Sequence, residues 1–181
     1  MTARFKEFKK DEITPEQVKV WDEVAGARTG AFPTPFHVLL ENPDLCRTVT
    51  SVGAICRYKT GLGPRLSELA ILTVATHWRC AYEFAVHTPE ARKGGVPEHE
   101  IEALKEGRRP DFKDADAALV YAFATELLDR RDVSDTTFDA AVARLSHKTT
   151  VELAGLIGYY SLLAMTMLAF RVPAPQKKDK G

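Results

Sequence analysis

Proline, glycine and capping residues divide this chain into segments in which apolar residues recur at the three- and four-residue spacing of an α-helix. Residues 14–17 (Thr-Pro-Glu-Gln) form a helix start, with an N-cap, a proline at the first helical position and a glutamine at the third. Pro43 opens another helix, and Gly94-Gly95 is a strong helix end. Alternating strand patterns joined by hairpin turns are missing from the sequence, as are internal repeats. The sequence therefore predicts an all-α fold.

The helices expected from this pattern differ widely in length. Thr88-Pro89 interrupts one of them, and we expect a kink or a break there because proline removes a backbone donor. The expected helices are 15–25, 36–41, 43–56, 65–76, 80–93, 96–107, 115–130, 134–145 and 149–170, the last capped by Thr149 or Thr150.

Size and charge restrict the class of protein. A length of 181 residues predicts one domain over 1–181, and the terminal segments 1–11 and 172–181 are expected to be flexible. The 25 basic residues balance 25 acidic ones, which argues against a nucleic-acid partner because such proteins normally carry a basic excess. The three cysteines are too few and too scattered for a disulfide framework. An odd cysteine count without a signal peptide fits a cytoplasmic protein.

The last expected helix, 149–170, is apolar nearly all round. Gly155, Gly158, Ser161 and Thr166 interrupt its apolar run, so a buried helix or a subunit interface is a better interpretation than a membrane span. A single small bundle does not easily cover such a helix on every side. We therefore expect a homo-oligomer that does not enter the membrane.

The chemically capable residues gather in one short stretch, from Glu68 to His87. Cys80, Glu83 and His87 are spaced so that a continuous helix would place all three on one face, and Tyr82 lies between them. A buried cysteine or histidine is often a plain core residue. A carboxylate buried beside an imidazole, however, costs free energy unless the two are paired, which favours a functional interpretation over a structural one. The remaining alternative is an exposed face on which Glu83 and His87 meet only water.

The motifs in this stretch resemble those of the carboxymuconolactone decarboxylase family, which shares its fold with the alkyl hydroperoxidase D proteins. The resemblance is strongest over 35–104, and it rests on residues 68–72 (ELAIL), 80–87 (CAYEFAVH) and 91–96 (ARKGGV), with 42–45 (NPDL) upstream. It implies an alkyl hydroperoxidase D-like helical bundle that assembles into trimers or hexamers. It also implies an active site around the 80–87 segment.

Carried over by motif, the resemblance assigns the proton-relay positions of the hydroperoxidases to Glu68, Cys80, Tyr82 and His87. Those enzymes have a second redox cysteine three residues after the first, and here that position is Glu83. Cys80 therefore lacks the partner for a local disulfide. Lactone decarboxylase members of the family work without a redox pair, so a glutamate at this position is compatible with acid–base chemistry.

The first functional hypothesis is a decarboxylase-like lyase acting on a small organic acid or lactone. His87 would act as general acid or base, Glu68 or Glu83 as its partner or a second acid, and Tyr82 as a donor to a developing oxyanion. The second hypothesis is a thiol peroxidase whose Cys80 thiolate is oxidised and then reduced by an external thiol. The third is an oligomeric binding protein without catalytic activity.

Cofactors and metals have little support in the sequence. Glycine-rich phosphate loops, GxSxG elbows and HExxH motifs are missing, so no cofactor is expected. His77, Cys80, Glu83 and His87 are all metal-ligand types, but His77 points away from the others on a continuous helix. The expected partner of the site is a small-molecule substrate.

Overall fold

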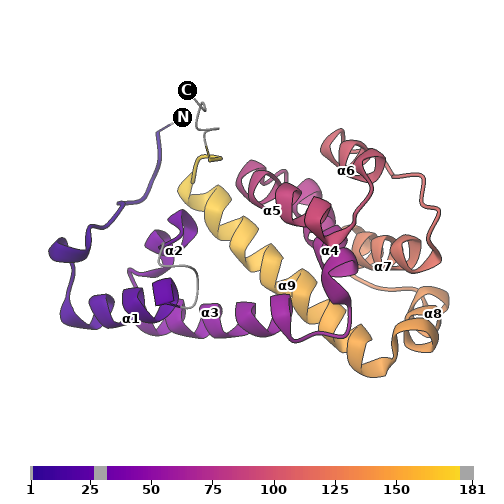
Figure 1. Ribbon diagram of the computed structural model, residues 1–181, viewed down its shortest axis with the longest axis horizontal. Helices are drawn as coiled ribbons and strands as arrows, with labels where there is room; N and C mark the ends of the chain where they lie inside the picture. The colour runs from indigo at the N-terminus through magenta and orange to yellow at the C-terminus, as the bar shows by residue number, and fades with distance from the viewer. Residues whose placement is uncertain (1, 27–31, 176–181) are drawn as a thin grey trace.

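The structure is a computed structural model of the chain, and it describes residues 2–26 and 32–175. These residues form helices, turns and connecting segments without any β-strand, which confirms the predicted all-α fold (Figure 1). A single 3-10 turn, η1 (Lys10–Glu12), comes first. The helices are α1 (Pro15–Gly26), α2 (Thr34–Leu39), α3 (Pro43–Tyr58), α4 (Gly63–His77), α5 (Ala81–Gly94), α6 (Glu98–Lys105), α7 (Ala115–Arg130), α8 (Asp135–Leu145) and α9 (His147–Phe170).

Capping residues set the helix ends that the sequence predicts. Thr14 and Gln17 bond each other's backbone N–H groups at 3.0 and 3.2 Å, which completes the expected capping box of α1. The Asn42 side chain accepts a hydrogen bond from the Leu45 N–H at the start of α3. Gly95 ends α5 with a φ of 91°, a left-handed conformation that glycine adopts without strain.

Most helix ends lie within two residues of the prediction, and α5 and α9 show departures that have a local cause. Helix α5 runs through Pro89 without a break, and the Thr88 hydroxyl donates to the Phe84 carbonyl at 2.6 Å in the turn before it. The carbonyl that Pro89 leaves without a donor belongs to Ala85, which is exposed, so water can satisfy it. Helix α9 begins at His147 rather than at Thr149, because the Ser146 hydroxyl caps it by accepting from the Thr149 N–H.

Helix α9 runs through the middle of the bundle and contacts α2, α3, α4 and α8 (Figure 1). By length and composition alone it is long and apolar enough to cross a membrane. Its central position explains the apolarity of one side, where Leu153, Leu156 and Ile157 are fully buried. The interpretation as a buried core helix thus holds for that side.

The segment before α1 lies against the folded chain. The Arg4 N–H donates to the Phe170 carbonyl at 2.9 Å, and the Phe8 N–H donates to His37 Nδ1 at 3.0 Å. These bonds tie the start of the described chain to α9 and α2. The expected flexibility of 1–11 and 172–181 stays a prediction, and residues 1 and 176–181 of those segments lie outside the described residues.

Candidate active site

Helices α4 and α5 pack along each other and bring the two ends of the 68–87 stretch together. Glu68 lies in the middle of α4, a helix whose central turns are almost entirely buried. His87 lies on the face of α5 that meets it, with Nδ1 2.8 Å from Glu68 Oε2. Both side chains are buried, so the carboxylate fixes the orientation of the imidazole in a site that excludes most water.

Glu83 lies one turn before His87 on the same face of α5. Its side chain is 2% exposed, which excludes the alternative of a water-facing stripe. Neither carboxyl oxygen has a hydrogen-bond partner among the residues that the structure describes. Burial raises the pKa of Glu83 to about 9, so the group is a neutral carboxylic acid at pH 7 and can donate a proton.

Cys80 is not on the helical face that its spacing predicts. It is the N-cap of α5, with extended φ and ψ of −85° and 91°, and it follows Arg79 in the left-handed region at a φ of 51°. Burial raises the pKa of its thiol to about 11, although the backbone N–H groups of Glu83 and Tyr82 act in the opposite direction. The thiol is therefore protonated at pH 7, and within the described residues Cys46, Cys56 and Cys80 form no disulfide bond.

A cavity of about 140 Å³ opens beside Glu83 and His87. For scale, a 150 Å³ engineered cavity in another protein holds a benzene molecule, so this one suits a ligand of about one ring. Of the five predicted site residues, Tyr82, Glu83 and His87 line it, whereas Glu68 and Cys80 do not. Its lining is otherwise mainly aromatic and aliphatic and comes from α2, α3, α5 and α9: Pro33, Pro35, Phe36, Arg57, Val86, Tyr159, Tyr160, Leu163 and Met167.

Several lining residues were not predicted as site residues. Tyr159 and Tyr160 of α9 both line the cavity, and the Tyr160 ring meets the His87 ring edge-to-face with centroids 5.0 Å apart. Arg57 is the cationic residue of the lining, and its Nε is buried without a hydrogen-bond partner. The position of Arg57 just before the end of a helix gave no sign of this, because only the tertiary packing of α3 against α9 brings it to the site.

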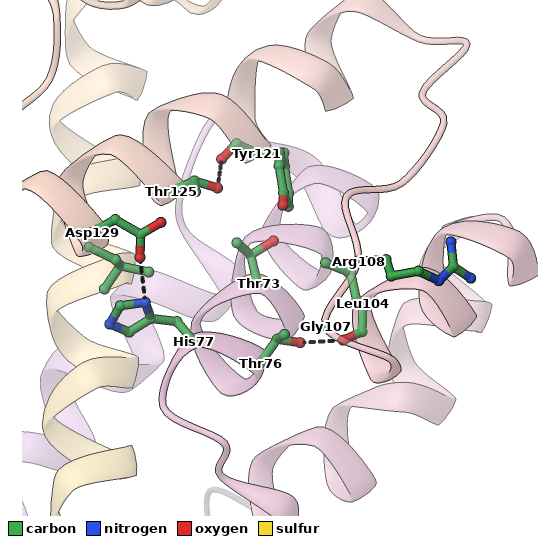
Figure 2. A pocket seen from close by; sticks show the side chains of 10 residues that line it. Thr73, Thr76, His77, Leu104, Gly107, Arg108, Tyr121, Thr125 and Asp129 are labelled. Atoms are coloured by element: carbon green, nitrogen blue, oxygen red, sulfur yellow. Dashed lines mark hydrogen bonds and ion pairs between the residues drawn. The ribbon is translucent and has the colours of Figure 1, made fainter.

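A second cavity, of about 130 Å³, lies between α4, α6 and α7 (Figure 2). His77 points into this region and lies 2.9 Å from Asp129, away from Cys80, Glu83 and His87 (Figure 2). The Thr76 hydroxyl donates to the Leu104 carbonyl at 3.0 Å. Within residues 2–26 and 32–175, no group of three or more His, Cys, Asp or Glu side chains is arranged to hold a metal.

The distribution of unsatisfied polar atoms separates the two cavities. In the part of the chain that the structure describes, the buried side-chain atoms without a partner belong to Arg57, Glu83 and Glu100, and none belongs to the lining of the second cavity. Buried polar groups normally have partners, and exceptions mark functional sites or missing ligands. The cavity beside Glu83 is therefore the candidate active site.

Part of the chain is similar to a known protein family. The model of the Carboxymuconolactone decarboxylase family matches residues 43–126. No curated protein sequence matches the chain significantly.

Solved structures share the fold at low sequence identity. An uncharacterised peroxidase-related protein from Silicibacter sp. TM1040 superposes with a TM-score of 0.77 at 13% identity, covering 98% of this chain and 94% of its own. A variant of the debrominase Bmp8 in complex with 2,3,4-tribromopyrrole gives a TM-score of 0.75 at 16% identity, covering 97% and 92%. The apo form of the same debrominase gives 0.73 at 18%, covering 97% and 93%.

The matched segment runs from the start of α3 into α7 and contains all five predicted site residues. The helical bundle around it is the one that the structural neighbours share. Over residues 43–126, this chain is therefore similar to the carboxymuconolactone decarboxylase family.

Proposed function

We propose that this protein is an enzyme that carries out acid–base chemistry, decarboxylation or proton transfer, on a small organic acid or lactone. One observation carries the proposal: a neutral, unpartnered Glu83 carboxyl group and a Glu68-oriented His87 border the same ring-sized cavity. A carboxylic acid that can donate a proton and an imidazole that can accept one, beside the same cavity, are the usual equipment of general acid–base catalysis.

The proposed reaction breaks one carbon–carbon bond and transfers one proton. In a decarboxylation, the bond between the α-carbon and the carboxylate breaks, its electron pair moves onto the neighbouring carbonyl to form an enolate, and carbon dioxide leaves. A hydrogen bond from the Tyr82 phenol would stabilise the enolate oxygen. Glu83 would then give its proton to the carbon and recover one from solvent. With lactone substrates, His87, held in place by Glu68, would accept a proton from the substrate as general base or return it as general acid.

The test is a screen in heavy water against β-keto acids and lactones. Turnover would place deuterium on the carbon that lost the carboxyl group, which proton NMR detects. We expect His87→Gln to lower the rate by roughly 10²–10⁴ without a comparable loss of stability. His99→Gln, at an exposed position on α6, is the matched control and should keep the wild-type rate. Wild-type turnover in His87→Gln, together with a melting temperature several degrees lower, would make His87 a structural residue instead.

Thiol-dependent peroxidase activity is the second candidate function. Two observations favour it: Cys80 is the N-cap of α5, where the backbone N–H groups of Glu83 and Tyr82 act to lower the pKa of its thiol, and one structural neighbour is described as peroxidase-related. The Cys80 thiolate would attack a hydroperoxide, release the alcohol and become a sulfenic acid, which an external thiol would reduce. The high pKa of Cys80 places this candidate second.

A further inference from the structure

Arg57 is a half-buried cation without a carboxylate partner. Other arginines of the described chain form ion pairs, such as Arg47 with Glu23 and Asp44 and Arg65 with Asp114. Arg57 has no such bridge among the described residues, and its guanidinium lies over the Tyr58 ring, 5.1 Å from the centroid. Leaving a buried charge uncompensated is costly, so this arrangement points to a counter-charge that arrives from outside the chain.

The neighbouring groups do not supply that charge. Glu68 and Glu90 lie near enough to raise the pKa of Arg57, but Glu68 is hydrogen-bonded to His87 and Glu90 is paired with Lys93. Neither carboxylate reaches ion-pair distance from the guanidinium among the described residues. Glu83 lines the same cavity in its neutral form, with both oxygens unpartnered. The cavity thus presents one cationic group and one neutral acid, and an incoming anion could bond to both.

The remaining walls restrict the rest of the ligand. Phe36, Tyr159 and Tyr160 supply flat aromatic surfaces, and Leu163 and Met167 supply aliphatic ones. Such walls favour an apolar ring and disfavour a second charged group. A volume of about 140 Å³ limits the ring to about one five- or six-membered cycle.

We propose that Arg57 is the specificity-determining residue of this site and that it binds the carboxylate of a ring-sized monoanion, with Glu83 donating a second hydrogen bond to the same group. The inference deepens the proposed function and rests on it, because it identifies the substrate class of the same cavity. A planar guanidinium binds a carboxylate through two parallel N–H donors, which an amide or a lysine cannot reproduce.

Equilibrium binding of ring carboxylates tests the proposal. Isothermal titration calorimetry with 2-furoate and benzoate, against 2-furamide and benzamide, isolates the contribution of the charge. We expect the wild-type protein to bind each acid at least tenfold more tightly than its amide. Arg57→Gln should lose that preference, and Arg57→Lys should keep part of it. Arg47→Gln, on the same helix but paired at the surface, should behave as the wild type.

Equal affinity for acid and amide in the wild-type protein, or no binding of any acid, would overturn the proposal whether or not the Arg57 variants fold. Retained preference in a folded Arg57→Gln would overturn it as well. The readout is independent of turnover. If binding depends on Arg57 but the protein catalyses neither decarboxylation nor proton exchange, the proposed function alone is contradicted. If the protein turns over substrate but binding does not depend on Arg57, this inference alone is contradicted.

Discussion

Burial sets the protonation of Glu83. Its titratable neighbours are Cys80 and His87 on its own segment, Arg57 on α3 and Tyr160 on α9, but no hydrogen bond from the described residues reaches its carboxyl group. Desolvation therefore decides its charge. A buried acid of this kind also makes the stability of the fold depend on pH.

We expect the free energy of unfolding to fall as pH rises from about 4.5 to about 9 because of this one group. The native state keeps the Glu83 proton up to its folded pKa of about 9, whereas the unfolded chain releases it near 4.5. The folded state thus binds more protons in this window, and the stabilisation, complete below the lower value, declines by about 1.4 kcal/mol per pH unit.

Urea unfolding at several pH values measures this slope. Glu83→Gln, which mimics the neutral acid, should remove it, and Glu102→Gln, at an exposed position on α6, should leave it unchanged. Identical slopes in the wild type and Glu83→Gln would mean that Glu83 is ionised in the folded protein.

Cys80 separates the two candidate functions. With a pKa of about 11, the thiolate fraction at pH 7 is on the order of 10⁻⁴. We expect slow alkylation of the native protein, no dimedone adduct after brief exposure to hydroperoxide, and substantial lyase activity in Cys80→Ser. Peptide mapping distinguishes Cys80 from Cys46 and Cys56, which serve as buried internal controls. Stoichiometric oxidation of Cys80, with all activity lost in Cys80→Ser, would promote the peroxidase function.

At the scale of single residues, the sequence predicted the titratable residues of the candidate site on α4 and α5 but not the lining residues from α3 and α9. Glu68 and His87 lie in one motif, and the packing of consecutive helices α4 and α5 brings them together. Arg57 and Tyr160 belong to helices far away in the chain, and their approach depends on how α3 and α9 pack. Cys80 does not share the helical face of Glu83 and His87, because α5 begins one residue later, at Ala81, and residue periodicity does not reveal this.

Gly53 of α3 lies against the Tyr159 side chain of α9. A β-carbon at this position would lie 2.2 Å from the Tyr159 hydroxyl oxygen, so only glycine leaves room for the tyrosine that lines the cavity. The contact makes α3 a support for the aromatic wall of the site. A change at Gly53 should therefore alter both packing and ligand binding.

For Gly53→Ala we expect a loss of about 1–3 kcal/mol of stability from overpacking. Alanine in a helix is otherwise favoured over glycine by about 1 kcal/mol. The displaced Tyr159 should also weaken binding of the carboxylate probes. Gly26→Ala, where an added methyl group meets nothing within 4 Å, is the control. Denaturant midpoints and probe affinities equal to the wild type would show that α3 shifts to accommodate the methyl group.

At the scale of helices, capping chemistry was the reliable guide. Thr14, Asn42 and Gly95 define boundaries through bonds with residues a few positions away, which local sequence encodes. The helix break expected at Pro89 does not occur. The free-energy cost of a proline depends on whether water reaches the carbonyl that it leaves without a donor. Which side of α5 faces solvent is decided by the packing of the whole molecule, which the local sequence does not reveal.

The outer side of α9 carries an exposed stripe of apolar and small residues. Val151, Leu162 and Met165 are exposed, as are Gly155, Gly158 and Ala169 in line with them. Their spacing of four and three residues keeps all six on one face, and the glycines allow a second helix to approach closely. We propose that this stripe is the contact between copies of the chain.

We expect sedimentation velocity at micromolar concentration to show a homo-oligomer, a trimer or hexamer as the family resemblance implies. Leu162→Glu should shift the protein towards the monomer, because it places a charge in the buried contact. Phe138→Glu, at an exposed apolar position on α8 away from the stripe, should not. A wild-type monomer would contradict the proposal.

The proton-transferring groups and the walls of the cavity come from different parts of the chain. Tyr82, Glu83 and His87 lie within the family segment 43–126, whereas α2 and α9, which supply most of the apolar lining, lie outside it. Under the proposed function, the groups that transfer protons and the walls that select the substrate would therefore lie in separate stretches of the chain, so a change in one stretch could leave the other intact. Two proteins that share the segment 43–126 could then have the same reacting groups and accept different substrates.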